Sequence, residues 1–202
     1  MIVYIESNFV LELSLEQEQA KSANDILLLA ENGKIELAFP AFALAEPFAT
    51  IAHRERERRR LCSSFSGQLR ELQRSKQHQD VVSQLEPAPN LLLEIGKKEF
   101  DLLQSTVMRL LKVGKSIGIS MIGFQKALAY QDRYGLSPQD SIIYSLVIGD
   151  LQRRGLKEAK CFISRNWKDF GDPDIKSELE FYNCAYLEDF TTGLRFIQST
   201  YM

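Results

Sequence analysis

Short apolar runs alternate along this chain with longer segments whose apolar residues recur every three or four positions. The short runs are rich in β-branched and aromatic residues, which predicts buried strands at residues 2–5, 35–39, 160–164 and 184–187. The longer periodic segments predict amphipathic helices at residues 16–32, 91–113, 121–134, 137–154 and 174–181. Strands that alternate with helices are typical of a parallel sheet covered on both faces. We therefore expect an α/β fold, with three α/β/α layers around a short central parallel sheet.

Proline and glycine residues set several of these boundaries. Ser137 and Pro138 open a helix as its N-cap and first residue, with Asp140 at the third position, and Gly155 ends it. Pro40 suits the first turn of another helix, and Pro47 should kink or restart that helix.

The composition changes abruptly at residue 53. Residues 53–76 contain eight Arg or Lys and three Glu, and their apolar residues keep a helical spacing. Residues 77–90 are polar and end in the sequence PAPN, which predicts a connection before the next helix. We expect one domain, residues 1–202, in which residues 53–117 form a helical elaboration.

Composition excludes several classes of protein. The net charge of −2 excludes a globally basic nucleic-acid binder, although a local basic patch remains open. Cys62, Cys161 and Cys184 are odd in number and widely spaced, which argues against a disulfide framework and against a zinc site. No basic leader precedes the first strand, and no apolar run approaches the about 20 residues that span a bilayer. We expect a cytoplasmic protein without a membrane partner.

Four carboxylates stand alone in or beside apolar segments. Glu6 is the only charged residue among residues 1–11, Glu46 among 38–52 and Asp140 among 134–149, and Asp169 follows the strand-like run at 160–164. A lone carboxylate in an apolar segment is destabilising unless a partner compensates its charge. Arg and Lys are absent from the first three segments, so a divalent cation is the expected partner, and oxygen ligands alone suit Mg²⁺ or Mn²⁺.

These segments resemble the PIN-domain nucleases, a family that includes the toxin ribonucleases of toxin–antitoxin operons. YIESNFVL is similar to the opening strand and Asp-Thr-Asn of the family, and ALAEPF to its Glu-bearing helix. RYGLSPQDSIIYSLV is close to the segment in which an Asp begins a helix, and FISRNWKDF matches the final Thr-Arg-Asn-x-x-Asp-Phe motif with Ser164 for Thr. The match covers residues 1–52 and about 118–190, and it implies a PIN-like fold with a helical insertion.

The resemblance implies a metal-dependent endoribonuclease. Its acidic tetrad falls on Glu6, Glu46, Asp140 and Asp169, which would bind Mg²⁺ or Mn²⁺ and activate water for hydrolysis of RNA phosphodiester bonds. A second set of polar residues would hold the carboxylates in position through hydrogen bonds: Ser7, Asn8, Ser164 and Asn166. Glu6 departs from the pattern because the family nearly always has Asp at that position. The extra methylene moves the carboxylate by about 1.5 Å if the side chain is extended.

Each acid also has a simpler interpretation. Asp140 would serve as the third residue of a capping box, and Glu6 would cap a helix through a backbone N–H. Glu46 would pair with an arginine of residues 54–60, and Asp169 would belong to a turn. A separate alternative keeps the acidic cleft: a catalytically weak or inactive PIN-like interaction module, held by an antitoxin-like protein partner whose arginines enter the cleft.

The basic segment leaves two interpretations open. Five arginines would contact the phosphates of an RNA substrate over the acidic cleft: Arg54, Arg56, Arg58, Arg59 and Arg60. Alternatively they lie on a solvated helical face, with Glu55 and Glu57 as internal ion-pair partners, or on the surface of a homodimer, the oligomeric state that we expect.

Overall fold

Five short strands form one parallel sheet. In this computed structural model, which describes residues 1–201, the strand order is β3-β2-β1-β4-β5 and every neighbouring pair is parallel. The strands are β1 (Ile2–Ile5), β2 (Glu36–Pro40), β3 (Lys115–Ile117), β4 (Lys160–Ile163) and β5 (Cys184–Leu187). The central strand is β1, since Ile2 pairs with Glu36 on one side and with Lys160 on the other.

Helices connect the strands. They are α1 (Ser7–Ser14), α2 (Ala20–Glu31), α3 (Phe42–Gln73), α4 (Gln79–Leu85), α5 (Ala88–Val113), α6 (Met121–Tyr134), α7 (Pro138–Arg154), α8 (Trp167–Phe170), α9 (Pro173–Phe181) and α10 (Phe190–Tyr201), with a 3₁₀ turn η1 (Lys76–His78). None of the helices in the described part of the chain is long and apolar enough to span a bilayer.

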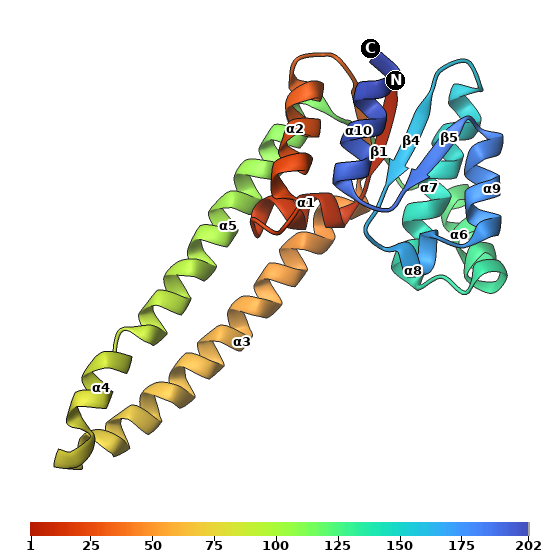
Figure 1. Ribbon diagram of the computed structural model, residues 1–202. Helices are drawn as coiled ribbons and strands as arrows, with labels where there is room; N and C mark the ends of the chain where they lie inside the picture. Colours follow the sequence, from red (N-terminus) through yellow and green to blue (C-terminus); the bar gives the residue numbers. More distant parts are fainter. Residues whose placement is uncertain (202) are drawn as a thin grey trace.

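The alternation of side chains along β1 divides the core into two halves. Val3 and Ile5 pack with α1, α2, α5 and α10 on one face of the sheet. Ile2 and Tyr4 point to the other face and pack with α6, α7, α8 and α9. Burial of each large aliphatic side chain contributes about 1.5–3 kcal/mol, so both faces need their helices. The expected α/β class with a parallel sheet is confirmed, and the arrangement is compatible with three α/β/α layers (Figure 1).

A long helical hairpin, made of α3 and α5, projects from this body with η1 and α4 at its far end (Figure 1). An ion pair crosses between its two helices: Arg58 donates to both carboxylate oxygens of Glu99, at 2.5 and 2.7 Å. Gly96 leaves the room for this contact, because a Cβ there would lie 3.1 Å from Arg58 Nη1.

The hairpin corrects the expected limits of the helical elaboration. Leu103, Val107 and Leu110, in the second half of α5, belong to the same core cluster as the sheet residues. Strand β3 lies at the edge of the sheet itself. The elaboration expected at residues 53–117 therefore includes part of the body, and α5 returns to the sheet before it ends.

One expectation about proline is wrong, because Pro40 ends β2 instead of opening a helix. Helix α3 continues through Pro47 without a restart, so a kink is what remains of the expectation there. The polar connection expected at residues 77–90 is mostly helical, because it contains η1, α4 and the start of α5. Pro89 sits in the first turn of α5, where the missing N–H has no partner to lose.

Candidate functional site

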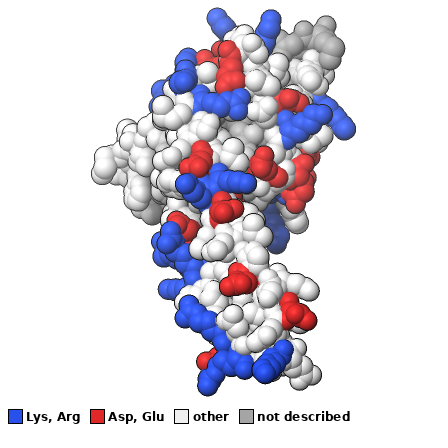
Figure 2. Space-filling model, turned by 90° about the vertical axis from the view of Figure 1, so that its left-hand side faces the viewer, with Lys and Arg blue, Asp and Glu red and all other residues white. Residues whose placement is uncertain are grey.

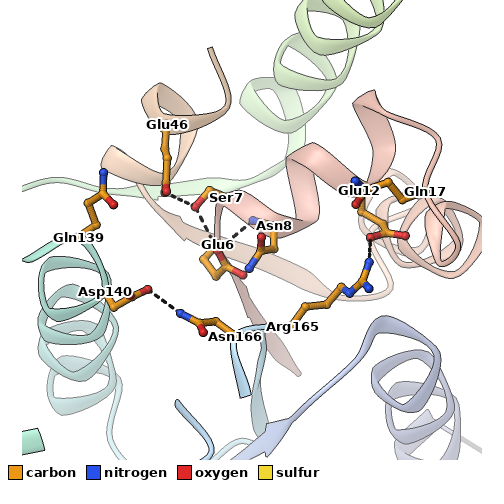
Figure 3. Close-up of a pocket in the computed structure, with 10 residues that line it drawn as sticks. All are labelled: Glu6, Ser7, Asn8, Glu12, Gln17, Glu46, Gln139, Asp140, Arg165 and Asn166. Carbon is orange, nitrogen blue, oxygen red and sulfur yellow. Dashed lines mark hydrogen bonds and ion pairs between the residues drawn. The ribbon is translucent and has the colours of Figure 1, made fainter. Parts of the chain in front are cut away.

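A polar pocket of about 450 Å³ opens beyond the carboxyl ends of β1 and β4, where ligands bind in parallel sheets. Three of the four expected acids line it: Glu6, Glu46 and Asp140 (Figure 3). They come from the N-cap of α1, the second turn of α3 and the first turn of α7. The fold thus brings together carboxylates that are far apart in the sequence.

Glu6 is a buried carboxylate, 3 % exposed, and both of its oxygens accept hydrogen bonds. Oε2 accepts from the Asn8 backbone N–H at 2.9 Å and Oε1 from the Ser164 hydroxyl at 3.0 Å. Burial raises the pKa of Glu6 to about 7, although these hydrogen bonds oppose the shift. Glu6 therefore caps α1, as its simpler interpretation expects, and its side chain also lines the pocket.

Ser7 lies between two of the acids. Its hydroxyl is within hydrogen-bond distance of Glu46 Oε2 and also of Glu6 Oε2, the latter at 3.1 Å. A hydroxyl has one hydrogen, so it can donate to only one of these carboxylates at a time. The other contact then needs a proton on Glu6, which its raised pKa favours, or a cation that takes the place of that proton.

Asp140 combines its capping role with a place in the pocket. Its Oδ2 accepts from the Ser137 hydroxyl at 2.5 Å, while the Asp140 backbone N–H donates to the same hydroxyl at 3.1 Å. Oδ1 accepts from the Asn166 side chain at 3.0 Å. Burial raises the pKa of Asp140, and the negative charge of Asp169 adds to the shift. Asp169 itself lies on α8 and is absent from the residues that line the pocket.

The polar neighbours expected around the acids make these contacts in the described residues. Ser7, Ser164 and Asn166 donate from their side chains, whereas Asn8 donates from its backbone. Asn166 also donates its backbone N–H to the Ser164 hydroxyl at 3.0 Å, which links the supports of Glu6 and Asp140.

The donor set suits a hard cation, because every candidate ligand is a carboxylate oxygen. As the side chains stand, however, no three Asp, Glu, His or Cys residues among residues 1–201 form a group that could hold a metal ion. Serine, asparagine and backbone donors occupy the carboxylates instead. Convergence of all four acids on one cation position therefore stays a prediction. Metal binding would require these carboxylates to give up some of their hydrogen bonds and to turn those oxygens toward the ion.

An ion pair that the sequence analysis did not single out completes the pocket. Glu12 is fully buried, and its Oε2 accepts from Arg165 Nη1 at 2.5 Å. Both residues line the pocket. Asn8 and Glu12 are four residues apart and share a face of α1, but nothing in the sequence pairs Glu12 with the distant Arg165.

The five arginines of the basic segment lie on the hairpin and outside the residues that line the pocket. Arg58 pairs with Glu99, Arg59 with Glu55 at 2.6 Å and Arg60 with Glu57 at 2.8 Å. The Arg59–Glu55 and Arg60–Glu57 pairs are those expected of a solvated helical face, whereas the Arg58–Glu99 pair bridges α3 and α5. Figure 2 shows Lys and Arg side chains along one edge of the hairpin. Glu46 has no ion pair with an arginine among the described residues, so the pairing considered for it is not observed.

Comparisons of this chain with protein-family models, curated proteins and solved structures gave no match.

Proposed function

We propose that this protein is a metal-dependent endoribonuclease of the PIN-domain type, which hydrolyses RNA phosphodiester bonds in the acidic pocket. The observation that carries the proposal is the meeting of Glu6, Glu46 and Asp140 in one polar pocket at the carboxyl edge of a parallel sheet. Burial raises the pKa values of two of these groups, Glu6 and Asp140, because it disfavours their charged forms. A bound cation would stabilise those charged forms. Asp169 adds negative charge beside Asp140.

Each residue has a defined part in the proposed reaction. Glu6, Glu46 and Asp140 would hold Mg²⁺ or Mn²⁺, with Asp169 close by. The bound ion would lower the pKa of a water molecule and polarise the phosphoryl oxygen. Glu46 would orient the attacking water. Among the described residues, its carboxylate accepts a hydrogen bond from Ser7 alone, so it has more free lone pairs than Glu6 or Asp140. Ser164 and Asn166 keep Glu6 and Asp140 in place.

A manganese titration tests the proposal. Isothermal calorimetry on the wild-type protein should show Mn²⁺ binding, and Asp140→Asn should weaken it at least about tenfold. Asp132→Asn is the matched control, because Asp132 is exposed on α6, and it should bind Mn²⁺ like the wild type. Cleavage of an RNA oligonucleotide should depend on Mn²⁺ or Mg²⁺ and be lost in Asp140→Asn alone. Absence of Mn²⁺ binding at millimolar concentration would refute the proposal.

One observation favours a second candidate function, the interaction module. The projecting hairpin exposes large apolar side chains, including Leu61, Leu91 and Ile95 at 58, 56 and 47 %. Such residues mark protein interaction surfaces when they gather in a patch. On this interpretation an antitoxin-like partner docks on the hairpin and the pocket acids stay in their present hydrogen bonds. The same titration separates the two candidates, because this one requires no metal.

A further inference from the structure

The two ends of the pocket differ in charge. Glu46 and Asp140 lie toward one end in Figure 3, and Arg165 reaches toward Glu12 at the other. Arg165 is the only cationic residue among the described residues that line the pocket. A polyanionic substrate that enters the pocket is therefore repelled at the acidic end unless a metal is bound. At the other end the charge of Glu12 is already paired, and the guanidinium of Arg165 offers N–H donors to the substrate.

Glu12 fixes the position of this arginine before any substrate arrives. Glu12 is 0 % exposed, its Oε1 accepts from the Gln19 backbone N–H at 2.5 Å and its Oε2 accepts from Arg165. A buried carboxylate with both oxygens engaged has little freedom to move. The guanidinium is thus preorganised, which reduces the entropy lost when it binds a ligand.

Most of the donors of Arg165 remain available. The hydrogen bonds that Arg165 makes to described residues leave from Nη1 alone, to Glu12 and to Glu18 at 3.3 Å. Glu18 is 81 % exposed, so water or a ligand competes easily for that longer contact. The edge formed by Nε and Nη2 carries no such bond, and two parallel N–H donors on one edge match two oxygens of a phosphate.

We propose that Arg165 binds a phosphate of the substrate next to the scissile one, and that Glu12 positions it for this contact. The inference deepens the proposed function and rests on it for the place of the scissile phosphate, at the acidic end of the pocket. It implies that the substrate carries at least two adjacent phosphodiester groups, as an oligonucleotide does. A phosphomonoester or a dinucleotide with a single phosphate lacks the second anchor.

The alternative role of Arg165 is structural, a tie between α1 and the segment after β4. The two roles predict different results. A structural tie matters equally for every ligand, whereas a phosphate contact matters only when the particular phosphate carries its charge. Replacement of one charged phosphodiester by an uncharged methylphosphonate isolates that difference.

The experiment measures binding of a short 2′-O-methyl RNA, which resists cleavage, by fluorescence anisotropy in Mn²⁺. Arg165→Gln should weaken binding about ten- to hundredfold, the range for a hydrogen-bonded charge contact. A methylphosphonate on one flank of the central linkage should weaken wild-type binding by a similar factor, and on that oligonucleotide Arg165→Gln should have no further effect. Both flanks are tested, because the direction of the strand in the pocket is open.

Two further variants make the result specific. Arg165→Lys keeps a charge beside Glu12 but loses the paired donors, so it should fold like the wild type and still bind the RNA more weakly. Arg74→Gln is the control, because Arg74 is exposed at the end of α3. A methylphosphonate should weaken RNA binding by this variant by the same factor as it weakens binding by the wild type.

An equal loss for Arg165→Gln on every oligonucleotide, or no loss on any, would overturn the inference. Absence of RNA binding by the wild type would overturn it as well. The manganese titration and the cleavage assay test the proposed function separately, so its failure can be told apart from failure of the inference about Arg165. If Arg165 passes the binding test and those assays fail, the pocket binds RNA phosphates without cutting them.

Discussion

Ser7 of α1 donates its hydroxyl hydrogen to Glu46 of α3, and this contact joins the end of the central strand to the base of the helical hairpin. The same hydroxyl also lies 3.1 Å from Glu6. Two carboxylates from different helices therefore share one small donor, and the position of each depends on it.

Removal of that donor provides the first prediction. Ser7→Ala should lower the affinity for Mn²⁺ about ten- to hundredfold, the usual effect of losing a group that orients a metal ligand. Calorimetry gives the affinity, and circular dichroism shows whether the fold is kept. Ser199→Ala, at an exposed position of α10, is the control. Unchanged affinity in Ser7→Ala would mean that Glu46 reaches the metal without help, or does not reach it.

The second prediction concerns pH and the metal-free protein. Burial raises the pKa of Glu6 from 4.5 to about 7, so between these values the folded protein holds a proton that the unfolded chain has released. The contribution of Glu6 to the free energy of unfolding should therefore be greatest below pH 4.5, fall by about 3 kcal/mol as the pH rises to 7, and then level off.

Urea denaturation in EDTA across this range measures the effect. Glu6→Gln should lack this contribution, because its amide does not titrate, so the difference in stability between the variant and the wild type should grow in favour of the variant as the pH rises to 7. Glu94→Gln, at an exposed position on α5, should behave like the wild type. Parallel stability curves for wild type and Glu6→Gln would show that Glu6 is ionised throughout.

The third prediction is the effect of Glu6→Asp, the residue that the PIN-domain resemblance implies at this position. The carboxylate of Glu6 spans from the Asn8 N–H to the Ser164 hydroxyl. A side chain shorter by one methylene loses one of these bonds, so the free energy of unfolding should fall by about 1 kcal/mol. Metal-dependent RNA cleavage should fall too, because the surroundings fit Glu. Faster cleavage would show that the longer side chain impairs coordination, and equal cleavage would remove position 6 from the ligands.

The fourth prediction tests the hairpin. Arg58 and Glu99 are only 22 and 15 % exposed, and they bridge α3 and α5. Arg58→Gln should lower the free energy of unfolding by about 1–2 kcal/mol, because it leaves a half-buried carboxylate without its charged partner. Arg59→Gln is the matched control, since its pair with Glu55 is exposed and should be worth less than about 0.5 kcal/mol. Hydrogen exchange should show the loss in α3 and α5 rather than in the sheet, and a uniform loss would contradict a role confined to the hairpin.

The elements that the sequence predicts well are those with strong local signals. Residues 2–5 are apolar throughout because both faces of β1 are buried, and Ser137-Pro138 marks the start of α7 unambiguously. The missed elements lack such signals. Strand β3 has three residues, two of them polar and exposed at the sheet edge, and α1 begins with a Glu in place of the usual short N-cap residue.

The same distinction holds for the pocket. Glu6, Glu46 and Asp140 stand out because each is alone in an apolar segment, so sequence reasoning finds them. Glu12 and Arg165 form a pair across more than 150 residues of chain, and each looks unremarkable among its own neighbours. Only the three-dimensional arrangement shows that one buried carboxylate holds an arginine at the pocket.

Helix α3 starts beside the pocket and ends at the far tip of the hairpin without a break, even at Pro47. At 1.5 Å per residue its 32 residues make a rod about 48 Å long, with Glu46 in its second turn. Glu46 and the hairpin tip thus belong to the same helix. One continuous helix therefore joins a carboxylate of the pocket to the part of the molecule that lies farthest from the sheet.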